Sequence, residues 1–116
     1  MRRSADFRRA YAEGVRARGS TLLVVVRPNG LDVSRYGLSI GKRVWKRAVR
    51  RNRVRRIFRE AFRLSRSELP AGLDVVMIAA EPHLEPGLEE TRRELVALAT
   101  RAWRRLERRA ERERPS

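Results

Sequence analysis

The chain has 116 residues, with 29 lysines and arginines against 14 acidic residues and a formal net charge of +15. This length fits one domain, 1–116, and the hydrophobic content of 41% suffices for one modest core. The absence of cysteine excludes disulfides, thiolate metal sites and a cysteine nucleophile. The apolar runs are too short to span a bilayer, and the first residues lack a secretory signal, so we expect a soluble cytoplasmic protein.

The first part of the chain predicts a short helix followed by three strands. Apolar residues recur at helical spacing from a serine N-cap to a glycine stop over residues 4–14, which predicts about three turns. Residues 15–18 alternate apolar with arginine, and residues 21–27 are rich in β-branched side chains, so both are predicted strands. After a turn at 28–30, residues 35–40 predict a strand antiparallel to residues 21–27.

The rest of the chain predicts a helix, a strand and a final helix. The helix runs from residue 47 to about 64, with one apolar face formed by Val54, Ile57, Phe58 and Ala61. Residues 73–80 predict a strand that is buried on both faces and therefore central in a sheet. Residues 87 to about 107 predict the last helix, and residues 108–116 a charged flexible tail. The apolar stripe of the last helix is Leu88, Leu95, Leu98, Ala102 and Leu106.

Positive charge is concentrated in residues 42–63, which hold eleven basic residues and a single acid, Glu60. Such a concentration costs self-repulsion, so it indicates a polyanionic partner, with RNA or DNA foremost. A merely solvated helix face would mix both signs of charge. Arg51, Asn52 and Arg53 are predicted to begin the basic helix, where free backbone N–H groups would add to their side-chain donors for phosphate.

Two aromatic residues, Phe7 and Tyr11, lie one helical turn apart on the first predicted helix. One interpretation is packing against the sheet, which the spacing alone favours. The other is a stacking platform for bases of a single strand, which are accessible in RNA as they are not in a duplex.

Residues suited to catalysis are few. His83 is the only histidine, and without a cysteine partner it cannot anchor an ordinary zinc site. Glu81, Glu85, Glu89 and Glu90 gather near the start of the last helix, where acids complement the helix dipole. Paired carboxylates could hold Mg²⁺ for phosphodiester cleavage, but the dipole interpretation is favoured. We therefore expect no catalytic residue and no metal site in the polypeptide itself.

The sequence resembles the protein component of bacterial ribonuclease P. The resemblance is carried by residues 6–14, 37–44 and 48–62, and it extends through residues 74–79 and the last helix. The most specific part is Arg51-Asn52-Arg53 followed at fixed spacing by Ala61-Phe62.

The resemblance implies an α+β fold, a compact α-β sandwich in the order helix, three strands, helix, strand, helix. It implies a four-stranded sheet with the basic helix in a left-handed crossover, against the general rule. It also implies an RNA-binding subunit of a ribonucleoprotein whose RNA is the catalyst and, with Mg²⁺ bound mainly by RNA, removes the 5′ leader of precursor tRNA. The implied partners are this catalytic RNA and precursor tRNA, with no membrane and no small-molecule substrate.

Carried over by position, the resemblance assigns two groups of binding residues. Those implied to face the catalytic RNA are Lys42, Arg43, Lys46, Arg50, Arg51, Asn52, Arg53, Arg55, Arg56 and Arg59. Those implied to hold the single-stranded leader, in a cleft between the first helix and the sheet, are Phe7, Arg8, Arg9 and Tyr11.

The sequence departs from the family pattern at three positions. Gly41 stands where a second serine is common, Trp45 replaces a common glycine, and Arg55 a common lysine. Trp45 raises a question about the loop, because glycine permits backbone angles that tryptophan resists. Two alternative functions are a ribosomal or other structural RNA-binding protein and a self-contained nuclease that uses the glutamates around Glu89.

Overall fold

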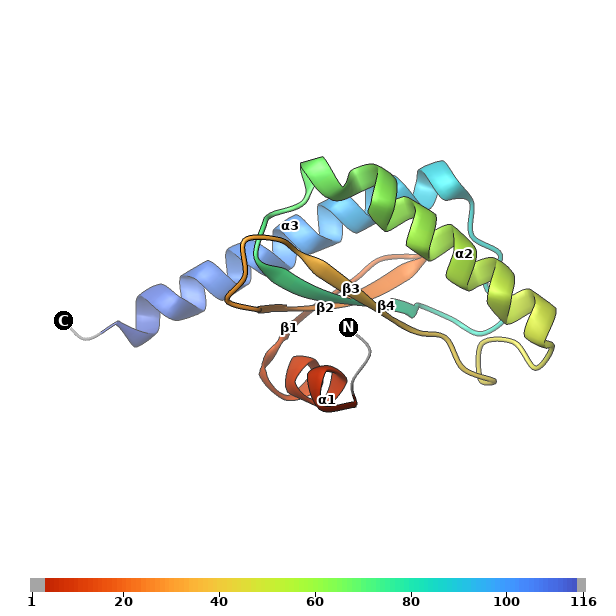
Figure 1. Ribbon diagram of the computed structural model, residues 1–116, viewed down its shortest axis with the longest axis horizontal. Helices are drawn as coiled ribbons and strands as arrows, with labels where there is room; N and C mark the ends of the chain where they lie inside the picture. The colour runs from red at the N-terminus through yellow and green to blue at the C-terminus, as the bar shows by residue number, and fades with distance from the viewer. Residues whose placement is uncertain (1–3, 115–116) are drawn as a thin grey trace.

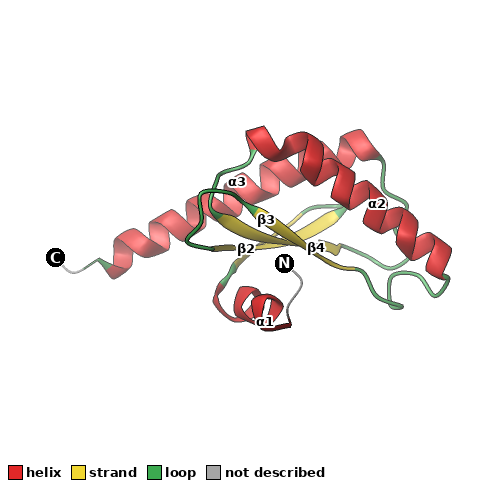
Figure 2. Cartoon of the chain, viewed as in Figure 1, coloured by secondary structure: helices red, strands yellow, loops and turns green. Residues whose placement is uncertain are grey.

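The computed structural model describes residues 4–114 and shows a four-stranded sheet with helices on both faces (Figure 1; Figure 2). The fold class and the order of elements are as expected. A 3₁₀ turn, η1 (Arg66–Glu68), follows the second helix. The elements are α1 (Ser4–Glu13), β1 (Val15–Arg18), β2 (Leu22–Pro28), β3 (Arg35–Ser39), α2 (Ala48–Ser65), β4 (Leu73–Ala79) and α3 (Leu88–Glu113).

The strands are arranged in the order β1-β2-β4-β3. β1 pairs with β2 and β2 with β4, both antiparallel, whereas β3 and β4 are parallel. β3 therefore runs antiparallel to β2, as expected, but the two are not neighbours, because β4 lies between them. Residues 73–77 of β4 are buried, and a strand that is apolar on both faces belongs in the interior of a sheet. The handedness of the β3–α2–β4 crossover stays a prediction.

The main core lies between the sheet and helices α2 and α3. The predicted apolar face of α2 is confirmed for Val54, Phe58 and Ala61, which are buried, and Ile57 packs at its margin. Phe62 is also buried, and its ring lies 4.9 Å from that of Tyr36 on β3. From α3 the buried residues are Thr91, Leu95, Leu98, Ala99, Ala102 and Leu106.

Helix α1 covers the opposite face of the sheet (Figure 1). A small buried cluster of Ala10, Val25 and Val76 joins it to β2 and β4. The chain turns from α1 into β1 at Gly14, where a Cβ atom would lie only 2.8 Å from Val25 Cγ1. This close approach requires glycine.

The last helix is longer than predicted, because α3 continues to Glu113. Residues 108–113 are therefore helical and not a frayed tail, which fits the high helix propensity of their arginine, glutamate and alanine residues. Residues 115 and 116 of the predicted tail lie outside the described residues. No helix within residues 4–114 is long and apolar enough to cross a membrane.

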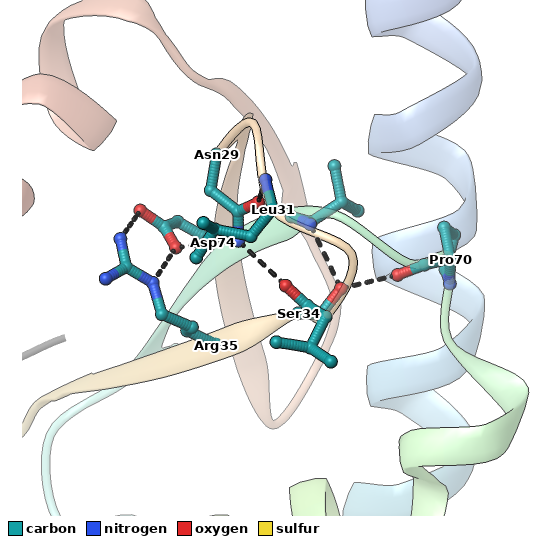
Figure 3. A network of polar contacts seen from close by, with 8 residues as sticks. Asn29, Leu31, Ser34, Arg35, Pro70 and Asp74 are labelled. Carbon is teal, nitrogen blue, oxygen red and sulfur yellow. Dashed lines mark hydrogen bonds and ion pairs between the residues drawn. The ribbon is translucent and has the colours of Figure 1, made fainter.

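A polar network fixes the edge strand β3 to the central strand β4 (Figure 3). Asp74 is fully buried, and its carboxylate accepts hydrogen bonds from Arg35 Nε and Nη2, both at 2.8 Å, and from Asn29 Nδ2 at 3.2 Å. Arg35 and Asp74 are also partners in the strand register, so the ion pair reinforces the pairing. Ser34 Oγ donates to Pro70 O and accepts from Leu73 N, which ties the loop before β3 to the start of β4.

The network also determines the ionisation of Asp74. Burial opposes the charged form, but the hydrogen bonds from Arg35 and Asn29 and the positive charges of Arg35 and Arg27 outweigh it. The pKa of Asp74 therefore lies below the ordinary aspartate value.

We expect Asp74→Asn to lower the free energy of unfolding at neutral pH by about 1–3 kcal/mol, because hydrogen bonds to a buried charge are lost. Since the folded pKa is below the unfolded one, this contribution is complete above about pH 5 and disappears as the pH falls through the folded pKa. Urea unfolding of the wild type and of the variant across this range should show that the difference between their free energies of unfolding becomes smaller in acid. Glu60→Gln, which removes an exposed ion pair with Arg63, is the control and should change stability far less. A difference in unfolding free energy that is unchanged in acid would contradict the lowered pKa of Asp74.

Candidate nucleic-acid interface

Seven of the exposed polar residues of α2 and the loop before it are treated as one group, here called the α2 basic surface. Three of them lie in the loop between β3 and α2, and the others on the outward side of α2, opposite its buried stripe. Within residues 4–114, none of its lysines or arginines pairs with a carboxylate. Within the described residues its positive charge is therefore not neutralised by ion pairs. The members are Lys42, Arg43, Lys46, Asn52, Arg53, Arg56 and Arg59.

Arg51 and Arg55, predicted as RNA contacts, are half-buried and bind the protein's own backbone. Arg55 Nη2 donates to Ile40 O at 2.9 Å. Arg51 Nη1 donates to Trp45 O at 2.9 Å and to Lys46 O at 2.7 Å. Both guanidinium groups thus hold the loop against α2, a positioning role that sequence reasoning missed because the partners are backbone carbonyls.

Trp45 is accommodated without backbone strain. Within residues 4–114 the only non-glycine residue with a positive φ is His83, at 58°. The indole Nε1 of Trp45 donates to Leu84 O at 2.8 Å, and its ring lies 4.9 Å from that of His83. Arg50 stacks on the indole at 5.3 Å and pairs with Glu85 at 3.0 Å. Trp45 therefore joins the loop before α2 to the loop after β4.

The start of α2 differs from the prediction. The helix begins at Ala48, and the backbone N–H of Arg51 already donates to Arg47 O at 3.2 Å. The backbone N–H of Arg50 also donates to Arg47 O at 3.2 Å, so the free N–H groups of the first turn lie before Arg50. The expectation that Arg51, Asn52 and Arg53 combine with free N–H groups is therefore wrong, because these residues lie one turn further along the helix.

The predicted leader-binding residues lie together on α1, on the other side of the sheet. Phe7 is half-buried against the cluster of Ala10, Val25 and Val76, so its ring serves packing while keeping part of its surface exposed. Tyr11 is 36% exposed and lies outside both core clusters. Arg8 and Arg9 are exposed. Phe7 therefore packs in part against the sheet and Tyr11 does not, and contact of either ring with the leader stays a prediction.

A groove of about 640 Å³ opens on this side, between the sheet and the loop that leads into α2. Arg18 and Arg43 contribute cations to its wall, and Leu23 and Ile78 contribute apolar surface. Ile78 also packs against the cluster on which Phe7 sits. The groove and the aromatic side chains of α1 therefore lie on the same face of the sheet.

Sequence reasoning missed Arg16 and Arg18 of β1. Arg18 Nη2 donates to Ala80 O at 2.6 Å at the groove, and the Arg16 guanidinium lies 6.0 Å from the centroid of the Tyr11 ring. The apolar–basic alternation of residues 15–18 was the available signal, because it places both arginines on one face of a strand. The sequence alone did not show which face of the sheet these two arginines occupy, because that depends on how β1 pairs with β2.

The glutamates considered for a nuclease are engaged separately. Glu85 and Glu89 form ion pairs with arginines, Glu90 accepts a hydrogen bond from Thr21 Oγ1 at 2.9 Å, and Glu81 lies at the groove. In the part of the chain that the structure describes, no three histidine or acidic side chains are grouped to hold a metal ion. Glu85, Glu89 and Glu90 therefore contribute to ion pairs and hydrogen bonds that hold separate parts of the fold.

The chain is similar in sequence to the proteins of one known family. The family model described as Ribonuclease P matches residues 1–103. The ribonuclease P protein component of Pseudomonas putida strain GB-1 is 45% identical over 91 residues, which cover 78% of this chain and 63% of that protein. The chain thus spans less than two thirds of that relative's length. The corresponding protein of Coxiella burnetii is 37% identical over 112 residues, covering 97% of this chain and 88% of the relative.

Solved structures show the same fold. The RNase P protein from Thermotoga maritima superposes with a TM-score of 0.76 at 30% identity, covering 87% of this chain and 94% of that one. The RNase P protein of Staphylococcus aureus gives a TM-score of 0.74 at 27% identity, covering 88% and 93%.

We expect Arg55→Ala to lower the free energy of unfolding by about 1 kcal/mol, because it removes the hydrogen bond that holds Ile40 O. Arg56→Ala removes an exposed neighbour of the same type and should change stability by less than about 0.5 kcal/mol. Urea unfolding measures both. Equal effects of the two substitutions would show that the loop does not depend on Arg55.

Proposed function

Because the chain belongs to the ribonuclease P protein family, we propose that it is the RNA-binding subunit of a ribonucleoprotein endonuclease that removes the 5′ leader from precursor tRNA. In this proposal the RNA subunit performs the cleavage, and the polypeptide supplies binding surfaces, in the cytoplasm. The observation that carries it is the α2 basic surface, whose cations find no carboxylate partner within residues 4–114. Such a surface gains free energy when phosphates displace counterions.

The α2 basic surface would bind the catalytic RNA. Arg53, Arg56 and Arg59 recur every three residues, so their guanidinium groups follow one side of the helix at a rise of about 4.5 Å each. Planar guanidinium groups suit bidentate contact with phosphate. Asn52 lies next to them, and its Oδ1 accepts a hydrogen bond from Arg55 Nη1 at 3.3 Å. Its amide N–H groups remain as donors for a base edge or a 2′-hydroxyl.

The leader would bind on the opposite face, along α1 and the groove. The half-exposed ring of Phe7 and the exposed ring of Tyr11 offer stacking surfaces for bases. Arg18 and Arg43 in the groove wall, with Arg8 and Arg9 on α1, offer cations for its phosphates. This proposed position of the leader is supported by the placement of all these groups on one face of the sheet.

Mg²⁺ in the holoenzyme would be held by RNA. The residues described here do not fit a metal held by the protein, because the carboxylates near the start of α3 are engaged separately with arginines and Thr21. The protein's part is therefore to bind and orient the two RNAs.

Reconstitution tests the proposal directly. At low Mg²⁺, where RNA alone is inefficient, we expect the protein to restore leader removal by ribonuclease P RNA, because its cations offset phosphate repulsion. The measurement is the rate of 5′ cleavage with and without protein. Failure to stimulate, with RNA binding retained, would indicate a structural RNA-binding protein. Cleavage by protein without the RNA subunit would indicate a nuclease.

Phe7→Leu tests the leader site while keeping an apolar side chain for packing. We expect it to weaken binding of leader-bearing precursor tRNA to the holoenzyme by about 1–3 kcal/mol, because one base loses its stacking partner. Affinity for mature tRNA, which has no leader, is the control and should be unchanged. Equal losses with both RNAs, or a lower free energy of unfolding that accounts for the loss, would assign Phe7 to packing alone.

A further inference from the structure

The C-terminal end of α3 lies beyond the family match, which ends at residue 103, whereas the helix continues to Glu113. It extends away from the sheet, at the opposite end of the molecule's long axis from the start of α2 (Figure 1). That axis measures 53 Å. Nothing in the proposed roles of α2 and the groove accounts for this segment.

Basic residues dominate the segment, since residues 101–114 hold seven arginines and three glutamates. Four of the arginines form one row, here called the arginine stripe: Arg101, Arg104, Arg108 and Arg112. At 100° per residue they fall within an arc of about 80°, and along the axis they cover about 16 Å. Glu107 and Glu113 point elsewhere, and Glu111 lies at the edge of the row.

Two further arginines and the apolar face hold this part of α3 in place. Arg105 Nη1 donates to Arg16 O at 2.7 Å, and Arg109 Nη2 donates to Glu13 O at 2.9 Å. Leu106 is buried in the main core, and Trp103 packs against it. The helix is therefore docked on the junction of α1 and β1, which fixes the direction in which the arginine stripe faces.

The stripe itself has no acidic partner. All four arginines are exposed, and among residues 4–114 none of them pairs with a carboxylate. Arg108 only donates a long hydrogen bond, at 3.5 Å, to Arg104 O. Shallow hollows of about 490 and 420 Å³ flank Arg108 on its two sides.

We propose that the arginine stripe is a second RNA-binding surface, which contacts backbone phosphates of a different segment of the catalytic RNA from the one at the α2 basic surface. This inference rests on the proposed function, because the partner is the same RNA. Guanidinium groups in a row suit phosphates, and a folded RNA is large enough to reach both ends of a 53 Å protein. A membrane surface is disfavoured, because the apolar face that would enter it is already buried against the sheet.

The experiment compares three double variants that each remove two positive charges. Arg104→Gln/Arg108→Gln tests the stripe, and Arg53→Gln/Arg56→Gln tests the α2 basic surface. Arg66→Gln/Arg93→Gln is the matched control, with two exposed arginines that belong to neither surface. Glutamine preserves helix propensity, and circular dichroism checks the helix content. The measurement is the affinity for ribonuclease P RNA as a function of monovalent salt.

We expect the stripe variant to reduce the slope of log affinity against log salt by about 1.4–1.8, because two phosphate contacts are lost. At 0.1 M salt this corresponds to roughly 30-fold weaker binding, and the control should retain the wild-type slope. If the stripe variant matches the control while the α2 variant loses affinity, the inference fails and the proposed function stands. If neither variant loses affinity, both the inference and the proposed function fail. If the stripe variant loses binding to anionic lipid vesicles while its RNA affinity is unchanged, the ligand of the arginine stripe is a membrane surface and not RNA.

Discussion

The central strand β4 is the constraint on which the rest of the structure depends. Its residues 73–77 are buried on both faces, and it pairs with β2 on one side and β3 on the other. A strand of this kind requires cover above and below. Helices α2 and α3 provide it on one face and α1 on the other, so the molecule presents two separate outer surfaces, one with the basic helix and one with the aromatic residues of α1.

Arginine serves two purposes in this protein, which differ in the partners of the guanidinium group. Arg51, Arg55, Arg105 and Arg109 donate to backbone carbonyls and hold loops and helices in place. The arginines of the α2 basic surface and of the arginine stripe form no ion pair with an acidic side chain within residues 4–114. One residue type therefore builds both the scaffold and the surface, because a guanidinium has enough donors for several acceptors.

The two proposed binding surfaces adjoin each other at one loop. The α2 basic surface and the groove meet at the loop between β3 and α2, where Arg43 belongs to both. Trp45 and Arg51 hold this loop through bonds to Leu84 O and to the loop's own carbonyls. A change in the loop's anchoring would therefore affect both of the proposed binding sites.

The sequence by itself determined the features that depend on neighbours along the chain. Helical spacing identified the buried stripe of Val54, Phe58 and Ala61 with arginines opposite, and the apolar run of residues 73–80 identified a central strand. Tertiary structure alone decided that β4 separates β2 from β3, that Arg51 and Arg55 bind loop carbonyls, that Arg18 reaches the groove and that Arg105 and Arg109 dock the end of α3. Apart from Arg51, whose carbonyl partners Trp45 and Lys46 are near in sequence, these contacts join residues far apart in the chain. Local periodicity carries no information about which distant partner each residue will meet.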